Sequence, residues 1–374
     1  MNASLNEKLR TVKWGEYKLG DLFKPQKITK MLSKEVLSDE FCFPVYSSES
    51  TNNGIIGYTD SPEFMCDDEH PIFVTFGDHT RSFNIATKSF SVLDNVKVLL
   101  PSIHNIRCLL WIVTAWQKQI PNLGYARHWK IAKNCIVELP TKEGKIDFNF
   151  MESFIAELEA ERIAELSAYL TVSGLDNYEL SSEEQNAIME FRNKAKSWGE
   201  YKLGDLFEIV SYKKRFDANK VTVIEEGGHP YIVRQSTENG KKGNIEASVE
   251  YLNDGNTISF GQDTATMFYQ EEPYFTGDKI KILKPKYSRF GKKNAQFFLA
   301  AMRKAFYAFG WGSSRFNVGT IADQTVLLPQ TSDCYIDFDF MELLISAVQK
   351  LVIKDVVLYA NQKIAATKEV VAKR

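Results

Sequence analysis

Residues 14–23 read WGEYKLGDLF, and residues 198–207 read the same ten letters without a change. Identity over that many consecutive positions is too long to be accidental, so it indicates an internal repeat. Weaker matches follow in the same order in both copies: Asn53-Gly54 with Asn239-Gly240, Phe76-Gly77 with Phe260-Gly261, Asp94 with Asp278, Gly124-x-x-Arg127 with Gly312-x-x-Arg315, and Leu139-Pro140 with Leu328-Pro329. The chain is therefore a duplicated scaffold whose middle portions have diverged.

The composition is that of a folded protein of two domains. The chain has 374 residues, of which 44% are hydrophobic and 25% charged, and a length of this order suggests two or three domains. No apolar run approaches the roughly 20 residues that span a membrane, and residues 1–13 are too charged for a secretory signal. Five scattered cysteines predict reduced thiols and a cytoplasmic protein. The net charge of −2 excludes a histone-like polybasic binder.

The pattern within each copy predicts an α+β fold. Short β-branched and aromatic runs, such as residues 72–76 and 96–100, alternate with Gly, Asn and Asp clusters, which is typical of strands and turns. A helix is expected near residues 106–119 in the first copy and near residues 294–306 in the second. Each copy then ends in a long amphipathic helix with a narrow apolar stripe. Each copy is thus expected to be a mixed α/β globule followed by a helix.

The two long helices are expected to pack against each other as a coiled coil, because neither apolar stripe is wide enough to be buried by one globule. The alternative is that each helix lies on its own globule. A polar linker between the copies contains Ser181-x-x-Glu184, a capping box that predicts a short helix with Ile188 and Phe191 on one face. The predicted segments are residues 1–146 (N-terminal segment and first domain), 147–174 (first long helix), 175–197 (linker), 198–336 (second domain) and 337–374 (second long helix).

Motifs of catalysis and metal binding are missing from the sequence. It contains no Pro-Pro dipeptide, which excludes the usual motif of amino-methyltransferases, and no phosphate-binding Gly-x4-Gly-Lys-Ser/Thr loop. The five histidines form no pair with the spacing of a zinc site. Glu16 and Glu200 resemble the end of a nuclease motif, but the Pro-Asp that should precede them is absent. We therefore predict a protein with no catalytic residues, no bound metal and no cofactor of its own.

A repeat joined by helices suits a ligand that is itself extended and bipartite, and duplex DNA is the leading candidate. A helix of about 25 residues is roughly 37 Å long, close to the roughly 34 Å of one DNA turn. Two other hypotheses remain open at this point. The chain could be an assembly scaffold whose globules bind proteins, or a nuclease built on Glu16 and Glu200.

The residues quoted above, in this order and in both halves, resemble the specificity (S) subunit of type I restriction–modification enzymes. The Asp-x-x-Lys-Val-Leu strand that begins at Asp94, and the Leu-Pro exit at residues 139–140 into a long helix, belong to the same resemblance. It implies two target-recognition domains, each reading half of a split DNA sequence and separated by an antiparallel pair of helices, without an active site. It also implies two modification (methyltransferase) subunits that bind S-adenosylmethionine, and restriction subunits that use ATP and Mg²⁺. Specificity subunits of type IIB systems are an alternative within the same family.

Candidate DNA-reading residues are polar residues of the divergent loops. Arg prefers guanine and Asn or Gln prefers adenine in the major groove, whereas Lys mostly contacts phosphate. The candidates in the first domain are Asn53, His79, Thr80, Arg81 and Arg127. Those in the second domain are Arg234, Gln235, Asn239, Lys241, Lys242, Gln262, Thr264 and Arg315.

For several candidates a structural role competes with DNA reading. Phe76-Gly77-Asp78 could form no more than a tight turn, and Lys241-Lys242 a solvated loop tip. Arg127 and Arg315 recur in both copies, which suits a phosphate contact or a structural role better than base reading. We expect Asp78 and Asp263 to orient neighbouring donors and not to contact DNA directly.

Overall fold

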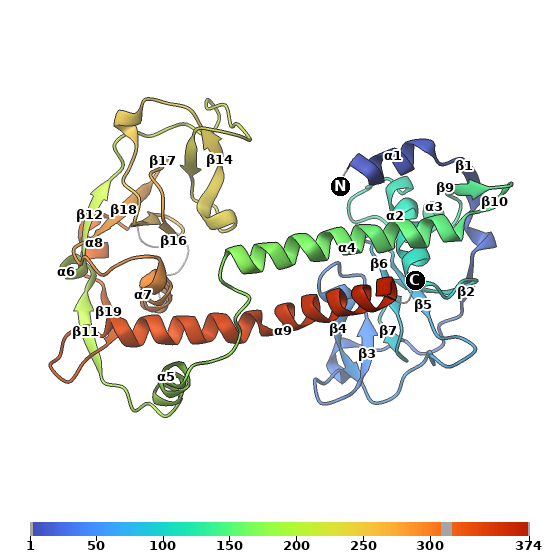
Figure 1. Cartoon of the computed structure of the whole chain (residues 1–374), viewed down its shortest axis with the longest axis horizontal. Coiled ribbons are helices and arrows are strands. Elements are labelled where there is room, and N and C mark those ends of the chain that lie inside the picture. Colours follow the sequence, from blue (N-terminus) through green and yellow to red (C-terminus); the bar gives the residue numbers. More distant parts are fainter. Residues whose placement is uncertain (1–2, 308–315, 373–374) are drawn as a thin grey trace. The chain divides into compact units, whose positions relative to one another are not determined.

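The computed structural model describes residues 3–307 and 316–372 (Figure 1). Its contacts separate two compact units, one of residues 1–169 and 360–374, the other of residues 170–359. Each unit combines short strands with helices, which confirms the predicted α+β class and the two tandem mixed domains. In the described part of the chain, no helix is both long enough and apolar enough to cross a membrane.

A four-stranded antiparallel sheet lies at the centre of each unit, with strand order β2-β8-β5-β6 in the first and β12-β18-β15-β16 in the second. The strands are β2 (Phe23–Gln26), β5 (Phe73–Gly77), β6 (Phe83–Ala86), β8 (Val96–Pro101), β12 (Phe207–Ser211), β15 (Thr257–Gly261), β16 (Met267–Gln270) and β18 (Ile280–Pro285). The registers agree as well, since Phe23 is opposite Pro101 and Phe207 is opposite Pro285. The repeat in the sequence is therefore a repeat in three dimensions.

A smaller sheet in each unit is connected to the loops that form the candidate site. Its order is β4-β3-β7 in the first unit and β14-β13-β17 in the second, with one parallel pair in each. The strands are β3 (Phe43–Tyr46), β4 (Ile55–Thr59), β7 (Ser91–Val92), β13 (His229–Ile232), β14 (Lys241–Ile245) and β17 (Phe275–Thr276). The loops from β3 to β4 and from β13 to β14 each end in a short helical turn, Asn52–Gly54 and Glu238–Gly240. The central residues of these turns, Asn53 and Asn239, both have φ near +50°, a conformation that asparagine tolerates better than most residues.

The first five of the ten identical residues form the strand that closes each unit. β1 (Trp14–Lys18) pairs with β9 (Ile136–Lys142), which also pairs with β10 (Lys145–Ile146), and β11 (Trp198–Lys202) pairs with β19 (Thr325–Pro329). Trp14 is opposite Pro140, and Trp198 is opposite Pro329. Both ends of each copy thus meet in one antiparallel ladder, which explains why identity is strongest at the edges of the unit.

An amphipathic helix covers the core of each unit. Helix α2 (Ile106–Gln119) spans the predicted residues, and α7 (Lys292–Phe306) begins two residues earlier than predicted. The spacing of Leu109, Ile112, Val113 and Trp116 places all four on the buried face of α2. The remaining short helices are α3 (Trp129–Ala132), α6 (Leu203–Leu206) and α8 (Val318–Ala322).

Each unit leads into a long helix, α4 (Phe148–Val172) and α9 (Phe338–Ala372). The carboxylates of Asp147 and Asp337 accept hydrogen bonds from the third backbone N–H of the following helix, both at 2.9 Å, which fixes the helix start. Met151 and Met341, one turn in, are fully buried in the core of their own unit. The first turns therefore lie on their own globule, and the coiled-coil pairing of the remainder stays a prediction.

A short helix packs beside each long helix (Figure 1). Helix α5 (Ser182–Arg192) begins with the predicted capping box of Ser181 and Glu184. Ala187 and Glu184 are its buried residues, whereas Ile188 is half-buried and Phe191 is exposed. Ile188 and Phe191 are three residues apart in this helix and so share a face, as predicted. In the first unit α1 (Ala3–Thr11) takes the corresponding place in the sequence, and its Lys8 forms an ion pair with Glu157 of α4.

Candidate nucleic-acid interface

A cleft opens at the same place in each unit, where three loop segments meet. The segments are the residues that follow β3 or β13, the turn of the β5–β6 or β15–β16 hairpin, and the connection from β7 to β8 or from β17 to β18. The first cleft, about 620 Å³, is lined by Ser48, His79, Thr80 and Asp94 among others. The second cleft, about 590 Å³, is lined by Arg234, Gln235, Thr264 and Asp278 among others.

The three segments are held in the same way in both units. The backbone N–H of Ser47 donates to Gly54 at 2.8 Å, and that of Val233 donates to Gly240 at 2.8 Å. Both hairpin turns close with a 2.8 Å backbone hydrogen bond, from residue 81 to the carbonyl of residue 77 and from residue 265 to that of residue 261. This confirms that Phe-Gly-Asp in the first unit forms a tight turn. The backbone scaffold of the two clefts is therefore the same.

A third bond of the same kind fixes the register of the remaining segment. Asp78 N–H donates to the Asn95 carbonyl at 2.8 Å, and Gln262 N–H donates to the Lys279 carbonyl at 2.9 Å. These bonds make three pairs of cleft positions equivalent: Ser48 with Arg234, His79 with Asp263, and Asn95 with Lys279. In each pair the side chain in the first unit differs in charge from the one in the second.

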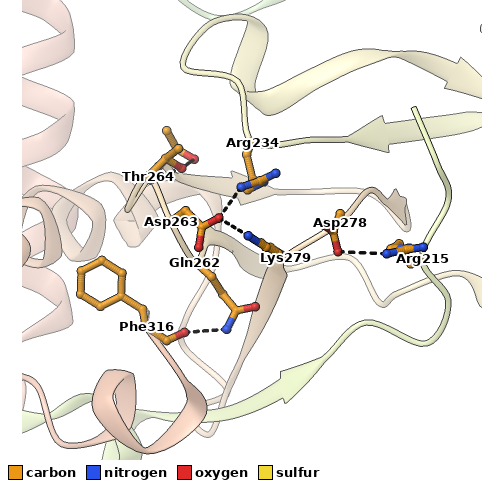
Figure 2. A network of polar contacts seen from close by, with 9 residues as sticks. Arg215, Arg234, Gln262, Asp263, Thr264, Asp278, Lys279 and Phe316 are labelled. Carbon is orange, nitrogen blue, oxygen red and sulfur yellow. Dashed lines mark hydrogen bonds and ion pairs between the residues drawn. The ribbon is translucent and has the colours of Figure 1, made fainter. Parts of the chain in front are cut away.

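The second cleft contains a network of cations and carboxylates (Figure 2). Arg234 Nη1 donates to Asp263 Oδ2 at 2.6 Å, and Lys279 Nζ donates to the same oxygen at 2.7 Å. Arg215 Nη1 lies 3.7 Å from Asp278 Oδ1, and both residues line the cleft. Arg215, Arg234 and Lys242 line the cleft against the carboxylates of Asp217 and Asp278, so cations outnumber anions in its wall.

Neighbouring polar groups hold the wall of the second cleft in place. Gln262 Nε2 donates to the carbonyl oxygen of Phe316 at 2.7 Å, and Thr264 and Thr266 share a hydroxyl–hydroxyl hydrogen bond of 2.9 Å. Burial, and secondly the carboxylate of Asp217, raise the pKa of Tyr231. Its phenol therefore keeps its proton and donates to the Phe216 carbonyl at 2.7 Å. Hydrogen bonds thus hold the residues that surround the cations of the second cleft.

The first cleft is held by neutral and aromatic contacts. The ring of His79 stacks on that of Tyr125, with centroids 4.4 Å apart and planes within 7°, and His79 Nδ1 lies 3.1 Å from the Tyr125 carbonyl oxygen. Ser48 Oγ donates to the Asn95 carbonyl at 2.7 Å, and Thr80 Oγ1 donates to the Ser48 carbonyl at 2.5 Å. Tyr125 is 87% exposed, so this stack presents a flat aromatic surface at the mouth of the cleft.

The structure brings six of the predicted reading residues into the two clefts. His79 and Thr80 line the first, and Arg234, Gln235, Lys242 and Thr264 line the second. Among the residues that the structure describes, Asn53, Arg81, Arg127, Asn239, Lys241 and Gln262 do not line these clefts. Arg315 lies outside the described residues.

Several candidates outside the clefts make structural contacts. Arg81 Nη1 donates to the carbonyl of Ile120 at the end of α2, at 2.9 Å, so the guanidinium ties the hairpin turn to that helix. Asn239 Nδ2 donates to the Tyr269 carbonyl at 3.0 Å. Arg127 is exposed and, within the described part of the chain, has no hydrogen-bond or ion-pair partner. The geometry favours a structural role for Arg81, whose reading of a base stays a prediction.

Asp263 orients neighbouring donors as predicted, because its carboxylate accepts from two cationic side chains, whereas the absence of a direct DNA contact stays a prediction. Asp78 instead accepts from the backbone N–H of Trp129 at 2.6 Å, so it holds the backbone and not a side-chain donor. The clefts are also lined by residues that were not predicted, among them Ser48, Tyr125 and Arg215. No repeated motif marks any of these three, whereas Asp94 and Asp278, which recur, could have been selected.

The two glutamates of the nuclease hypothesis lie on the strands that close the two units. Glu16 lies on β1 and Glu200 on β11, and both side chains are exposed. Over the residues that the structure describes, no group of three or more His, Cys, Asp or Glu side chains is arranged to hold a metal ion.

Comparisons with known proteins agree with the two-unit architecture. The family model described as "Type I restriction modification DNA specificity domain" matches residues 11–168 and again residues 195–357. A relative from Heyndrickxia coagulans, the specificity subunit S.BcgI of a type II restriction enzyme, is 23% identical over 350 residues, 88% of this chain and 93% of the relative. The crystal structure of a type I restriction–modification S subunit from M. genitalium has a TM-score of 0.56 at 12% identity, covering 96% of this chain and 94% of that one. That likeness shows that the fold is the same.

Proposed function

The chain belongs to the family of type I restriction modification DNA specificity domains, whose members recognise DNA without catalysing a reaction, and from this premise we propose that it reads a bipartite target. One half-site is recognised by the cleft of each unit, as part of a type I restriction–modification complex. The observation that carries this proposal is the pair of clefts on one backbone scaffold with different linings. Base readout requires variable polar groups on a fixed frame, and the loops of the two units have this arrangement.

The long helices act in this proposal as the spacer between the half-sites. The 25 residues of α4 correspond to roughly 37 Å, close to one turn of duplex DNA. Along α9, Leu351 and Val352 are exposed apolar residues, 45% and 74% accessible. We propose that the apolar stripes of α4 and α9 pair as an antiparallel coiled coil in the assembled complex.

The catalytic steps belong to partner subunits in this proposal. Two modification subunits bind S-adenosylmethionine and transfer the methyl group, and restriction subunits use ATP and Mg²⁺ for cleavage. This chain recognises the DNA sequence and provides the surface on which these subunits assemble. We place the complex in the cytoplasm.

A second candidate is a specificity subunit of a type IIB system, in which one partner polypeptide contains both nuclease and methylase. The observation that favours it is the 23% identity, over 88% of this chain, to S.BcgI, the specificity subunit of a type II restriction enzyme. Both candidates share the same mode of DNA recognition and differ in their partners.

Selection of bound duplexes from a random library, by the full chain together with its co-purified modification partner, tests the proposal. We expect two blocks of fixed bases separated by unconstrained positions, and binding that weakens as salt rises. Absence of any fixed block would contradict DNA recognition and would favour the assembly scaffold. The masses of the co-purified partners then separate the two candidates, because type I partners are separate polypeptides and the type IIB partner is a fusion.

A further inference from the structure

The guanidinium of Arg234 is fixed on one side and open on the other. Its Nη1 donates to Asp263 Oδ2 at 2.6 Å, and Asp263 is its one hydrogen-bonding partner in the described part of the chain. The side chain is 32% exposed and lines the second cleft. Figure 2 shows the contact with Asp263, and the Nε–Nη2 edge has no hydrogen-bonding partner among the described residues, so it remains available to a ligand.

The open edge has the chemistry that matches guanine. Nε and Nη2 present two parallel N–H donors, and guanine presents two acceptors, O6 and N7, on its major-groove edge. Adenine pairs an acceptor with a donor on the same edge, and pyrimidines offer one polar group, so they cannot accept both bonds.

Asp263 fixes the direction in which that edge points. Its Oδ2 accepts from both Arg234 and Lys279, whose backbones lie on different loops of the cleft. An arginine that is held by a carboxylate loses less side-chain entropy on binding than a free one. Two cations on one carboxylate also leave the cleft positively charged toward DNA.

The first unit lacks this arrangement at the equivalent positions. Ser48, His79 and Asn95 replace Arg234, Asp263 and Lys279, and their polar atoms are bonded to backbone carbonyl oxygens or to a neighbouring carboxylate. No guanidinium lines the described part of the first cleft. An arginine positioned by a carboxylate therefore cannot recognise a guanine in the first cleft.

We infer that the half-site read by the second unit contains a guanine recognised by Arg234, that Asp263 is the residue that positions Arg234, and that the half-site of the first unit is read without this contact. The inference rests on the proposed bipartite recognition and deepens it by naming a base class for one half-site.

Duplex selection by the full chain with its modification partner tests the inference, with Arg234→Lys and Asp263→Asn as variants. Arg234→Lys keeps the charge but removes the fork, so the preference for one guanine in one half-site should fall about 5- to 150-fold. Asp263→Asn should lower the preference at the same base by a smaller factor, without weakening non-specific binding, since it removes a negative charge. Placing 7-deazaguanine at that position, which lacks N7, should weaken wild-type binding, whereas inosine, which keeps O6 and N7, should not.

The matched controls are Arg289→Lys and Asp339→Asn, an arginine–aspartate pair of the same unit that does not line the second cleft. They should leave every base preference unchanged, and thermal unfolding of all four variants checks that they fold. A bipartite preference without a fixed guanine in either half, or with a guanine that ignores Arg234→Lys, overturns the inference and leaves the proposed function intact. Selection without any base preference overturns both.

Discussion

The two units differ in the side chains at three equivalent positions of the cleft loops, although their backbones are alike. The second unit has Arg234, Asp263 and Lys279 there, and the first has serine, histidine and asparagine. The backbone hydrogen bonds that build the clefts differ by no more than about 0.1 Å between the units. The backbone bonds of the two clefts are thus alike although the side chains at these positions differ.

The same contrast recurs where a short helix meets the long one. In the second unit, Glu184 is nearly buried and accepts hydrogen bonds from Lys350 at 2.8 Å and from Ser346 at 2.6 Å. In the first unit, Lys8 and Glu157 form an ion pair in which both side chains are more than 40% exposed. The two ion pairs therefore contribute differently to stability although the helices are arranged alike. Removing the partner of a buried charge costs far more free energy than removing the partner of an exposed one.

The largest test replaces residues 24–140 with residues 208–329, which end at equivalent positions of the two ladders. The chimera has two second-unit clefts, so its selected target should contain the same bases in both halves. Each base of the original first half-site that becomes a mismatch should cost about 1–3 kcal/mol of binding free energy. Binding titrations with the original and the doubled target measure this. The unchanged second half-site is the internal control, and a retained first half-site would show that readout lies elsewhere.

Removing the buried carboxylate of Glu184 on α5 should have the next largest effect, in this case on stability. Burial opposes the ionisation of Glu184, but hydrogen bonds from Lys350, Ser346 and the backbone of Ser181 outweigh it and hold the pKa of this carboxyl below its usual value. A lowered pKa in the folded state stabilises the fold above the ordinary pKa of a glutamate, and this stabilisation is lost as the pH falls through the folded value. Glu184→Ala should cost about 3 kcal/mol at neutral pH, since it leaves Lys350 without its carboxylate.

Hydrogen exchange of the α5 amides from pH 7 to pH 3 measures this effect in one helix. Wild-type protection should decline toward the acid end, and Glu184→Gln should show weaker protection that changes less with pH. Glu190→Gln, an exposed glutamate of the same helix, is the control and should behave as wild type. A Glu184→Gln profile parallel to that of the wild type would mean that the carboxylate is not what couples α5 to pH.

Transferring the charged network to the first unit gives a smaller effect. The triple variant Ser48→Arg, His79→Asp, Asn95→Lys places the second-unit side chains on an equivalent backbone, and residue 95 already has the positive φ that Lys279 adopts. We expect a new guanine preference in the first half-site, worth about 1 kcal/mol because the surrounding wall is not matched to it. Duplex selection measures it, with Ser48→Arg alone as the control for an arginine without its carboxylate. No new guanine would mean that the second-unit wall is required.

Local signals in the sequence were sufficient for most of the fold. The repeated ten residues revealed the duplication, the apolar spacing located α2, and Ser181 with Glu184 located the start of α5. The clefts were only half predictable, because they join segments distant in the chain. Arg234 and Asp263 are 29 residues apart, and the sheet topology alone brings them together. Arg81 could not be distinguished from a reading residue, since its partner is a backbone carbonyl 39 residues away.

The smallest effect is expected at the exposed ion pair of the first unit. Lys8→Ala should change the protection of the α1 amides by less than about 1 kcal/mol, because both partners of Lys8–Glu157 keep most of their hydration when apart. Leu5 on the same helix is 1% exposed, and Leu5→Ala should cost about 2–5 kcal/mol, which identifies apolar burial as what holds α1 in place. Hydrogen exchange at low and high salt separates the two contributions. If Lys8→Ala released α1 as fully as Leu5→Ala does, the two units would depend on charge to the same degree, and the contrast between them would be confined to the clefts.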